Sequence, residues 1–301
     1  MSAHDDTGVR TAGKRAPHAL PSGTTVGRVS LQVSELERSV TFYETVLGFR
    51  AIERASLRAS LGDSAGAVLL ELQTGDGVSM ARPGSLGLYH FAVLLPDRAA
   101  LGRLIRHLAD RGIRVSAADH LVSEAIYLHD VDGLGIEVYA DRPREAWTTL
   151  GGELAITTEP LDFDRLLAAA GSEQWQTLPA GTKIGHVHLH VGELPRARQF
   201  YHEQLGLDIV VSSYPGALFL SAGGYHHHLG VNTWAGPHAR LPPTFAARLL
   251  YWELVVPDVA AAREAANRLR QGGHPVTELI AEAVWEVQDP WRTALRIRAA
   301  G

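Results

Sequence analysis

The sequence contains no cysteine, which excludes disulfides and thiolate metal sites. Runs of lysine or arginine are also missing and the net charge of -5 is mild, so nothing indicates binding to nucleic acid or to an anionic membrane. The longest apolar stretches, such as residues 91–96, have the length of a strand and cannot span a membrane. Residues 1–24 are polar and lack an apolar segment, which predicts a disordered tail rather than a signal peptide. We therefore expect a cytoplasmic protein that binds neither nucleic acid nor membranes.

Apolar residues and histidines, by contrast, are abundant. Hydrophobic residues make up 46% of the 301 positions, enough for a sizeable core, and the length suggests two domains or one domain built by duplication. The chain has 15 histidines. Because thiolates are absent, a metal ion would have to bind to imidazole, carboxylate or water, which suits iron, manganese, nickel, zinc or copper.

One pattern occurs four times along the chain. Residues 27–36 (GRVSLQVSEL) recur at 185–194 (GHVHLHVGEL), and in both copies a Phe-Tyr pair and then a Leu-Gly pair follow at the same spacing. Two weaker copies begin at His90 and Tyr251. The spacing indicates four copies of one structural unit. An acidic residue stands seven positions after the first-strand residue of each copy, which is Arg28, His90, His186 or Tyr251.

Each copy has the same order of predicted elements. A first strand ends at the acidic residue, which is placed to cap the amphipathic helix that follows. A glycine ends each helix, and short strands complete the copy. This order predicts an α+β fold of four βαβββ modules. The predicted helices span residues 37–47, 98–111, 194–205 and 259–271, and the glycines are Gly48, Gly112, Gly206 and Gly272.

The modules divide the chain into two halves. Modules one and two would form an N-terminal domain at 25–142, and modules three and four a C-terminal domain at 184–301. The stretch 143–183 is a linker with a predicted short helix near residues 161–170. A fourfold βαβββ repeat resembles the vicinal oxygen chelate superfamily, which implies two cup-shaped sheets, each made from two modules around a metal ion or a ligand. Some members of that superfamily bind ligands without a metal, so the fold alone leaves the function open.

Module two contains the most informative segment, residues 119–137. A His, a Tyr and a Glu follow one another there, and Asp130 to Gly133 form a predicted turn between the strands of Tyr127 and Glu137. This hairpin would set the phenol beside the carboxylate on one face of the sheet. Taken singly, each residue has an ordinary structural explanation, namely packing, solvation or a common turn.

The combination resembles the signature of type I extradiol ring-cleavage dioxygenases. That signature has a His, a spacer, an apolar residue and Tyr, then an Asp-Pro-x-Gly turn, and then a metal-binding Glu. Val131 replaces the proline of the turn, and Ala118 stands where glycine is usual. Both differences concern the backbone of a turn and remove no chemical group. The matching residues are His120, Ile126, Tyr127, Asp130, Gly133 and Glu137.

The resemblance implies a facial triad of two histidines and one carboxylate as the metal site. By position, Glu137 matches the carboxylate and His90 one imidazole. A partner module must supply the second imidazole, and of the four first-strand residues only His186 can do so. Modules two and three are therefore predicted to hold the metal. In the commoner extradiol arrangement modules three and four hold it, so we interpret this sequence as having an exchanged pairing of modules. The corresponding places of modules one and four, which would form a metal-free pair, are taken by Arg28, Tyr251 and Arg296.

A run of histidines, His226 to His228, lies in the predicted last strand of module three. Side chains alternate along a strand, so His227 would face away from its two neighbours. The resemblance assigns an acid–base role to a histidine in this place, which His227 matches best and which His228 would match if a bulge shifts the register. A surface cluster or an adventitious metal site is the alternative explanation of the run. Tyr127 and His120 would hydrogen-bond the bound substrate.

The resemblance extends from Gly27 to the last strand. Among extradiol enzymes, the sequence is similar to a group of two-domain catechol 2,3-dioxygenases. It implies an iron(II)-dependent extradiol dioxygenase of aromatic catabolism, with a catechol-type diol and dioxygen as its partners. The metal would be Fe(2+), with Mn(2+) as the alternative, and we also expect a homo-oligomer. Two other functions stay open. One is a glyoxalase-type metal-dependent isomerase or lyase, for which Glu71 could be a ligand, and the other is a metal-free drug-binding resistance protein.

Overall fold

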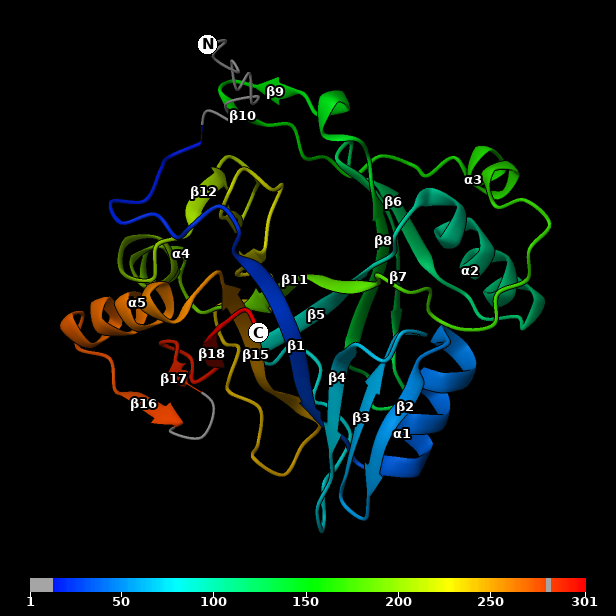
Figure 1. Ribbon diagram of the computed structural model, residues 1–301, viewed down its shortest axis with the longest axis horizontal. Helices are drawn as coiled ribbons and strands as arrows, with labels where there is room; N and C mark the ends of the chain where they lie inside the picture. Colours follow the sequence, from blue (N-terminus) through cyan, green and yellow to red (C-terminus); the bar gives the residue numbers. More distant parts are fainter. Residues whose placement is uncertain (1–12, 280–282) are drawn as a thin grey trace.

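The computed structural model describes residues 13–279 and 283–301, and two eight-stranded sheets dominate this part of the chain (Figure 1). The first sheet has the strand order β12-β13-β14-β11-β5-β8-β7-β6. Its strands are β5 (Gly87–Leu94), β6 (Ser116–Asp119), β7 (Ser123–His129), β8 (Gly135–Asp141), β11 (Lys183–His190), β12 (Asp208–Val211), β13 (Ala217–Ser221) and β14 (Leu229–Asn232).

The second sheet has the strand order β16-β17-β18-β15-β1-β4-β3-β2. The predicted α+β fold of four modules and two large sheets is thereby confirmed. The strands of this sheet are β1 (Thr25–Gln32), β2 (Arg50–Ala55), β3 (Arg58–Gly62), β4 (Val68–Gln73), β15 (Arg248–Val256), β16 (Val276–Leu279), β17 (Val284–Gln288) and β18 (Ala294–Ala299).

The helices of modules two and four begin as the sequence predicts. They are α2 (Arg98–Asp110) and α5 (Val259–Gln271). The carboxylates of Asp97 and Asp258 each accept the backbone N–H of the residue three positions on, at 2.7 and 2.8 Å. These caps supply a partner for N–H groups that have none inside the helix.

The helices of modules one and three begin without an acidic cap. Glu35 and Glu193 precede them, but neither side chain bonds to the helix, so the predicted acidic caps are formed in only two of the four modules. Both helices end in a wider π turn. They are α1 (Leu36–Phe42) followed by η1 (Tyr43–Leu47), and α4 (Leu194–Ala197) followed by η3 (Arg198–Gln204).

Each sheet joins one module from each half of the chain. Strand β5 of module two pairs antiparallel with β11 of module three, and β1 of module one pairs antiparallel with β15 of module four. The exchanged pairing of modules two with three and one with four is therefore confirmed. The division into residues 25–142 and 184–301 describes the repeat along the sequence, whereas both sheets cross it.

Residues 13–24 lie against module three rather than forming a tail. The backbone N–H of Ala16 donates to the Asp208 carboxylate at 2.7 Å, that of Leu20 donates to the Gly206 carbonyl at 2.8 Å, and both Ala16 and Leu20 are buried. The prediction of disorder is wrong for these residues, because Ala16 and Leu20 are buried and the backbone around them is hydrogen-bonded to module three, contacts that the sequence alone does not reveal. Residues 1–12 lie outside the described residues.

The linker contains the predicted short helix, α3 (Phe163–Ala169), beside α2 (Figure 1). The two helices approach closely at Gly102, where a Cβ atom would lie 2.6 Å from the carbonyl oxygen of Leu166. Before α3 the linker forms three short elements, which are η2 (Arg144–Ala146), β9 (Thr149–Leu150) and β10 (Glu153–Leu154).

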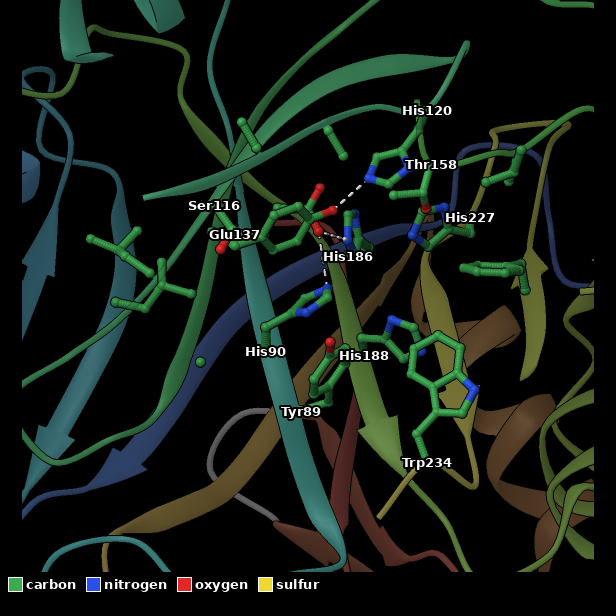
Figure 2. Close-up of a pocket in the computed structure, with 18 of the residues that line it drawn as sticks. Tyr89, His90, Ser116, His120, Glu137, Thr158, His186, His188, His227 and Trp234 are labelled. Atoms are coloured by element: carbon green, nitrogen blue, oxygen red, sulfur yellow. Dashed lines mark hydrogen bonds and ion pairs between the residues drawn. The ribbon is translucent and has the colours of Figure 1, made fainter. Parts of the chain in front are cut away.

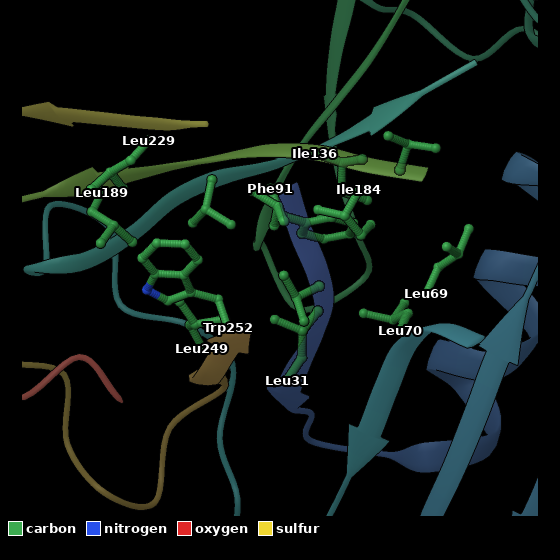
Figure 3. Close-up of a cluster of buried hydrophobic side chains, with 14 of the residues drawn as sticks. Leu31, Leu69, Leu70, Phe91, Ile136, Ile184, Leu189, Leu229, Leu249 and Trp252 are labelled. Atoms are coloured by element: carbon green, nitrogen blue, oxygen red, sulfur yellow. The ribbon is translucent and has the colours of Figure 1, made fainter. Parts of the chain in front are cut away.

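The two sheets pack against each other through apolar side chains, several of which appear in Figure 3. Phe91 of β5 and Leu189 of β11 lie in this core with Leu31 and Trp252 of the second sheet. Side chains alternate between the two faces of a strand. Burial of Phe91 therefore turns its neighbour His90 to the opposite face of the first sheet, away from the core.

Two buried hydrogen bonds tie the modules of each half together across the sheets. The phenol of Tyr43, at the end of the module-one helix, donates to Asp130 in the module-two turn at 2.9 Å. The phenol of Tyr201 donates in the same way to Asp289 in module four at 2.8 Å. Burial raises the pKa of both carboxyl groups to about 6, against the hydrogen bonds that favour their ionised forms.

Replacing Tyr43 by Phe should lower the free energy of unfolding by about 1–3 kcal/mol at pH 8, because the buried Asp130 carboxylate loses a donor. The phenol stabilises the ionised carboxylate, so its removal matters most above the Asp130 pKa of about 6 and least below it. Urea unfolding of both proteins at pH 5 and pH 8 measures this difference. An equal loss at the two pH values would show that the carboxylate is not involved.

Candidate metal centre and pocket

Three side chains from neighbouring strands converge on the face of the first sheet that lies away from the core. They are His90 on β5, Glu137 on β8 and His186 on β11, with 6%, 3% and 1% of their surfaces exposed. The strand register brings them together, because Ala92 of β5 is opposite both Glu137 and His186. Their potential ligand atoms lie within 4.8 Å of one another, and no other such group of three occurs in residues 13–279 and 283–301.

The geometry of these atoms suits a metal ion. The Nε2 atoms of His90 and His186 each lie 3.0 Å from the same oxygen of Glu137. The His90 Nε2 is nevertheless buried without a hydrogen-bond partner among the described residues. The His186 Nε2 does form a hydrogen bond with this oxygen, so the imidazole of His90 is the one whose short contact is left without hydrogen-bond geometry, as expected of an atom that faces a common third point.

The charges of the three side chains also suit a cation. Burial lowers the pKa of both imidazoles, so His90 and His186 are neutral ligands. Burial alone would raise the pKa of Glu137, but its contacts with the two histidines hold that pKa well below its usual value. Two neutral imidazoles and one carboxylate form a buried metal site of the facial-triad type, which leaves adjacent positions open.

The site lies in a cavity of about 430 Å³ (Figure 2). The cavity wall is mainly apolar and aromatic, and no lysine or arginine is among the described residues that line it. Strands β7 and β8 form one side, and β11, β13 and the loop after β14 form the other. The apolar and aromatic part of the wall includes Val122, Leu128, Ile136, Ile156, Tyr214, Phe219 and Trp234.

Tyr127 and His120 stand together on the β7 side of the cavity. Tyr127 is directly opposite Glu137 in the strand register, as the hairpin predicted. The Tyr127 phenol and the His120 Nε2 are 2.6 Å apart, and the His120 Nδ1 contacts the Thr157 carbonyl. A carbonyl can only accept, so Nδ1 carries the proton of His120 and Nε2 accepts from Tyr127. Burial and the charge of Glu137 raise the pKa of Tyr127 well above its usual value, so the phenol stays protonated.

The three consecutive histidines have different surroundings. They do not lie in a strand as predicted, because β14 begins only at Leu229 and the run belongs to the connection from β13. His227 faces the cavity, and its ring centroid is 4.0 Å from that of His186. His228 faces away, with its Nδ1 3.2 Å from the Ser221 hydroxyl. All three rings are buried, so the interpretation as a surface cluster is wrong.

Several residues of the cavity wall escaped the sequence analysis. His188 lies two positions after His186 on β11 and faces the same cavity, with its Nε2 3.0 Å from the Asn232 amide (Figure 2). The alternation of histidines in HVHLH is a signal that could have revealed it. Thr158 of the linker and Trp234 beyond β14 carried no signal, because only tertiary contacts bring them to the site.

The second sheet has a different set of residues in the same three places. The register puts Arg28, Glu71 and Tyr251 where the first sheet has its triad. Glu71 is 2.8 Å from Arg28 and accepts a hydrogen bond from the Tyr251 phenol. The guanidinium supplies the positive charge there. Glu71 lies in the other sheet, away from the triad, so the ligand set considered for a glyoxalase-type enzyme is not formed, and a metal-free binding protein would not require a buried triad.

The family model of the Glyoxalase/Bleomycin resistance protein/Dioxygenase superfamily matches residues 25–138 and 183–292, and the chain belongs to this superfamily. Within it, the chain is a homologue of a catechol-2,3-dioxygenase of Bacillus subtilis (strain 168). The two sequences are 44% identical over 276 residues, which cover 90% of this chain and 96% of that protein.

Solved structures share the fold at much lower identity. A putative dioxygenase from Bacillus subtilis subsp. subtilis str. 168 has a TM-score of 0.65 at 13% identity and covers 94% of this chain and 86% of its own. Glyoxalase I from Zea mays has a TM-score of 0.56 at 14% identity, with coverage of 91% and 92%. At these identities the similarity concerns the fold alone. No helix in the described residues is long and apolar enough to cross a membrane.

Replacing Glu137 by Gln, or His90 or His186 by Ala, should abolish metal retention while the protein stays folded. Each change removes one of three ligands, and water in its place supplies neither the charge nor the orientation. The matched control is Glu71→Gln, which alters the equivalent carboxylate of the second sheet and should leave the metal content unchanged. Elemental analysis of untagged protein measures the metal, and circular dichroism checks folding. Stoichiometric metal in His186→Ala would contradict the assignment.

Proposed function

We propose that the protein is an iron(II)-dependent extradiol dioxygenase that opens the ring of a catechol-type diol with dioxygen. The observation that carries this proposal is the His90–Glu137–His186 triad at the base of a cavity that also contains His227 and Tyr127. The homology to a catechol-2,3-dioxygenase supports it. The homo-oligomeric state stays a prediction.

The triad would hold the metal ion and orient it toward the cavity. A divalent iron held by these three residues would supply open coordination positions for the diol and for dioxygen. Iron is favoured over manganese because a triad of two histidines and one carboxylate with open positions is typical of non-haem iron(II) oxygenases. Turnover of protein loaded separately with Fe(2+) and Mn(2+) distinguishes the two metals.

Tyr127 and His120 would position the diol. The phenol proton is directed to the Nε2 of His120, so the Tyr127 oxygen is free to accept a hydrogen bond from a catechol hydroxyl. Since His120 is in turn held by the Thr157 carbonyl, neither ring needs to move when the substrate enters. Such prior orientation lowers the entropy cost of reaching the reactive geometry.

His227 would act as the acid–base residue. Burial lowers its pKa well below the usual value, so the resting imidazole is neutral and can take a proton from a catechol hydroxyl. The proton would return to the substrate side later in the reaction. His228, the alternative in the sequence, is disfavoured because its Nδ1 faces Ser221 and Ala222 instead of the cavity.

The cavity wall favours an uncharged, apolar ring substituent. Its side chains are mostly aliphatic or aromatic, and Glu137 is the only carboxylate among the described residues that line it. A substituent carboxylate would lose its hydration there without gaining a cationic partner. The substrates we propose are therefore catechol and alkylcatechols rather than catechols with a carboxylate.

Replacing His227 by Ala should keep near-normal metal content and reduce turnover by roughly 10²–10⁴-fold, the usual effect of losing a general acid or base. The diol should still bind, because the triad is intact. His228→Ala is the matched control and should lose far less. Steady-state rates and bound iron are measured for both variants. If both variants lost only a little turnover, His227 would not be the acid–base residue, and His120 would be the next candidate.

Methylcatechols should have a kcat/KM at least about 100-fold higher than 3,4-dihydroxybenzoate, because burying an unpaired carboxylate costs several kcal/mol. Ile156→Arg, which places a cation in the wall, should narrow this ratio. Initial rates over a range of substrate concentrations give the values. A carboxylated catechol turned over as efficiently as methylcatechol would refute the substrate class while leaving the reaction type intact.

A further inference from the structure

A chain of hydrogen bonds runs from the end of β8 to the cavity. Asp141 lies four residues after Glu137, and its Oδ1 is 2.9 Å from the Nε2 of His226. The Nδ1 of His226 is in turn 2.7 Å from the Nδ1 of His227. His226 is completely buried, whereas the Asp141 side chain is 28% exposed.

With Asp141 ionised and His226 neutral, the donor and acceptor capacities of the three groups order the protons along this chain. An ionised carboxylate can only accept, so the Nε2 of His226 donates to Asp141. The Nδ1 of a neutral His226 then has a free lone pair, and it accepts the N–H of His227 Nδ1. This leaves the Nε2 of His227 without a proton and without a hydrogen-bond partner among the described residues.

We propose that His226 and Asp141 are positioning residues that hold His227 as the Nδ1-protonated tautomer, with an unprotonated Nε2 available in the cavity. The inference rests on the proposed function, because it concerns how His227 becomes able to accept a proton from a diol. His226 makes no hydrogen bond to the triad, although its ring centroid lies 6.2 Å from that of His186, and it is not among the described residues that line the cavity. Its effect passes through the ring of His227.

The surroundings hold the His226 ring in the required orientation. The ring of Tyr225 is tilted against it at 4.1 Å, and the rings of Trp147 and Tyr139 lie 5.5 and 5.9 Å away. Tyr225 also donates to Asp141 at 3.2 Å, and the Tyr139 phenol is 2.7 Å from that of Tyr225. Rotation of His226 would break both of its ring contacts, so the tautomer of His227 follows from packed side chains.

Two replacements of His226 separate positioning from packing. In His226→Asn the side-chain oxygen stands near the place of Nδ1 and can accept from His227, whereas His226→Leu fills the apolar space but offers no acceptor. If His226 positions His227, the Leu variant should lose kcat roughly 10- to 100-fold, with metal content and KM nearly unchanged, and the Asn variant should recover most of the loss. If His226 only packs, the Leu variant should be at least as active as the Asn variant, which would overturn the proposal.

The tautomer itself gives a readout that does not depend on activity. Zinc-loaded protein with 15N-labelled histidine is diamagnetic, and the nitrogen chemical shifts of His227, assigned by comparison with His227→Gln, should report a protonated Nδ1. A protonated Nε2 would refute the inference. If His226→Leu does not fold, Asp141→Ala replaces it and should give a mixture of tautomers and a lower kcat. A single tautomer at full kcat in Asp141→Ala would exclude a role for the carboxylate.

Two controls keep the outcomes distinguishable. His202→Leu removes another buried histidine, whose Nδ1 contacts the Leu207 carbonyl outside the cavity, and it should leave kcat unchanged. His227→Ala is measured in parallel. If His227→Ala keeps full turnover, the acid–base part of the proposed function fails. If His227→Ala is impaired and His226→Leu is not, only the positioning role fails.

Discussion

The pairing of β5 with β11 is the constraint on which the rest of this structure depends. It places Phe91 and Val187 on the face that packs against the second sheet, and their neighbours His90 and His186 on the opposite face. Because side chains alternate with a period of two, a slip of one residue in either strand would send a histidine into the core and an apolar residue into the cavity. The energy of core packing therefore also fixes the geometry of the metal site.

A comparison with the second sheet separates the contribution of the backbone to the site from the contribution of the side chains. The register of the second sheet reproduces the three ligand places, yet Arg28 and Tyr251 stand where the first sheet has imidazoles. Arg28 lies between Glu71 and Glu253, so the cation that the first sheet would take from solution is here part of the chain. The same fold thus balances the charge of a carboxylate in two ways, with an arginine in the second sheet and with the metal ion that would bind in the first. Only the first sheet, where the neighbours of the carboxylate are neutral imidazoles, leaves space for a metal ion and a substrate.

Burial lowers the pKa of the histidines in the cavity and, taken alone, would raise that of the carboxyl group. The site can bind a cation because only the first of these two effects prevails. The histidines stay neutral as ligands or as a base. Burial would discharge Glu137, were it not for the two imidazoles whose contacts keep the carboxylate ionised. Asp141 differs from these buried groups, because its side chain is 28% exposed at the end of β8, where it contacts His226.

The sequence by itself determined the four modules, because they follow from periodic spacing, whereas the triad of His90, Glu137 and His186 and the pairing of modules two and three followed from that repeat together with the resemblance to extradiol dioxygenases. The sequence did not determine that residues 13–24 pack onto module three, that Ile156 and Thr158 of the linker line the cavity, or that the histidine run lies outside a strand. His226 meets Asp141, 85 residues earlier in the chain, and spacing carries no information about that contact. Such contacts were decided by the tertiary structure, since they arise where separate modules are pressed together by burial of a common core.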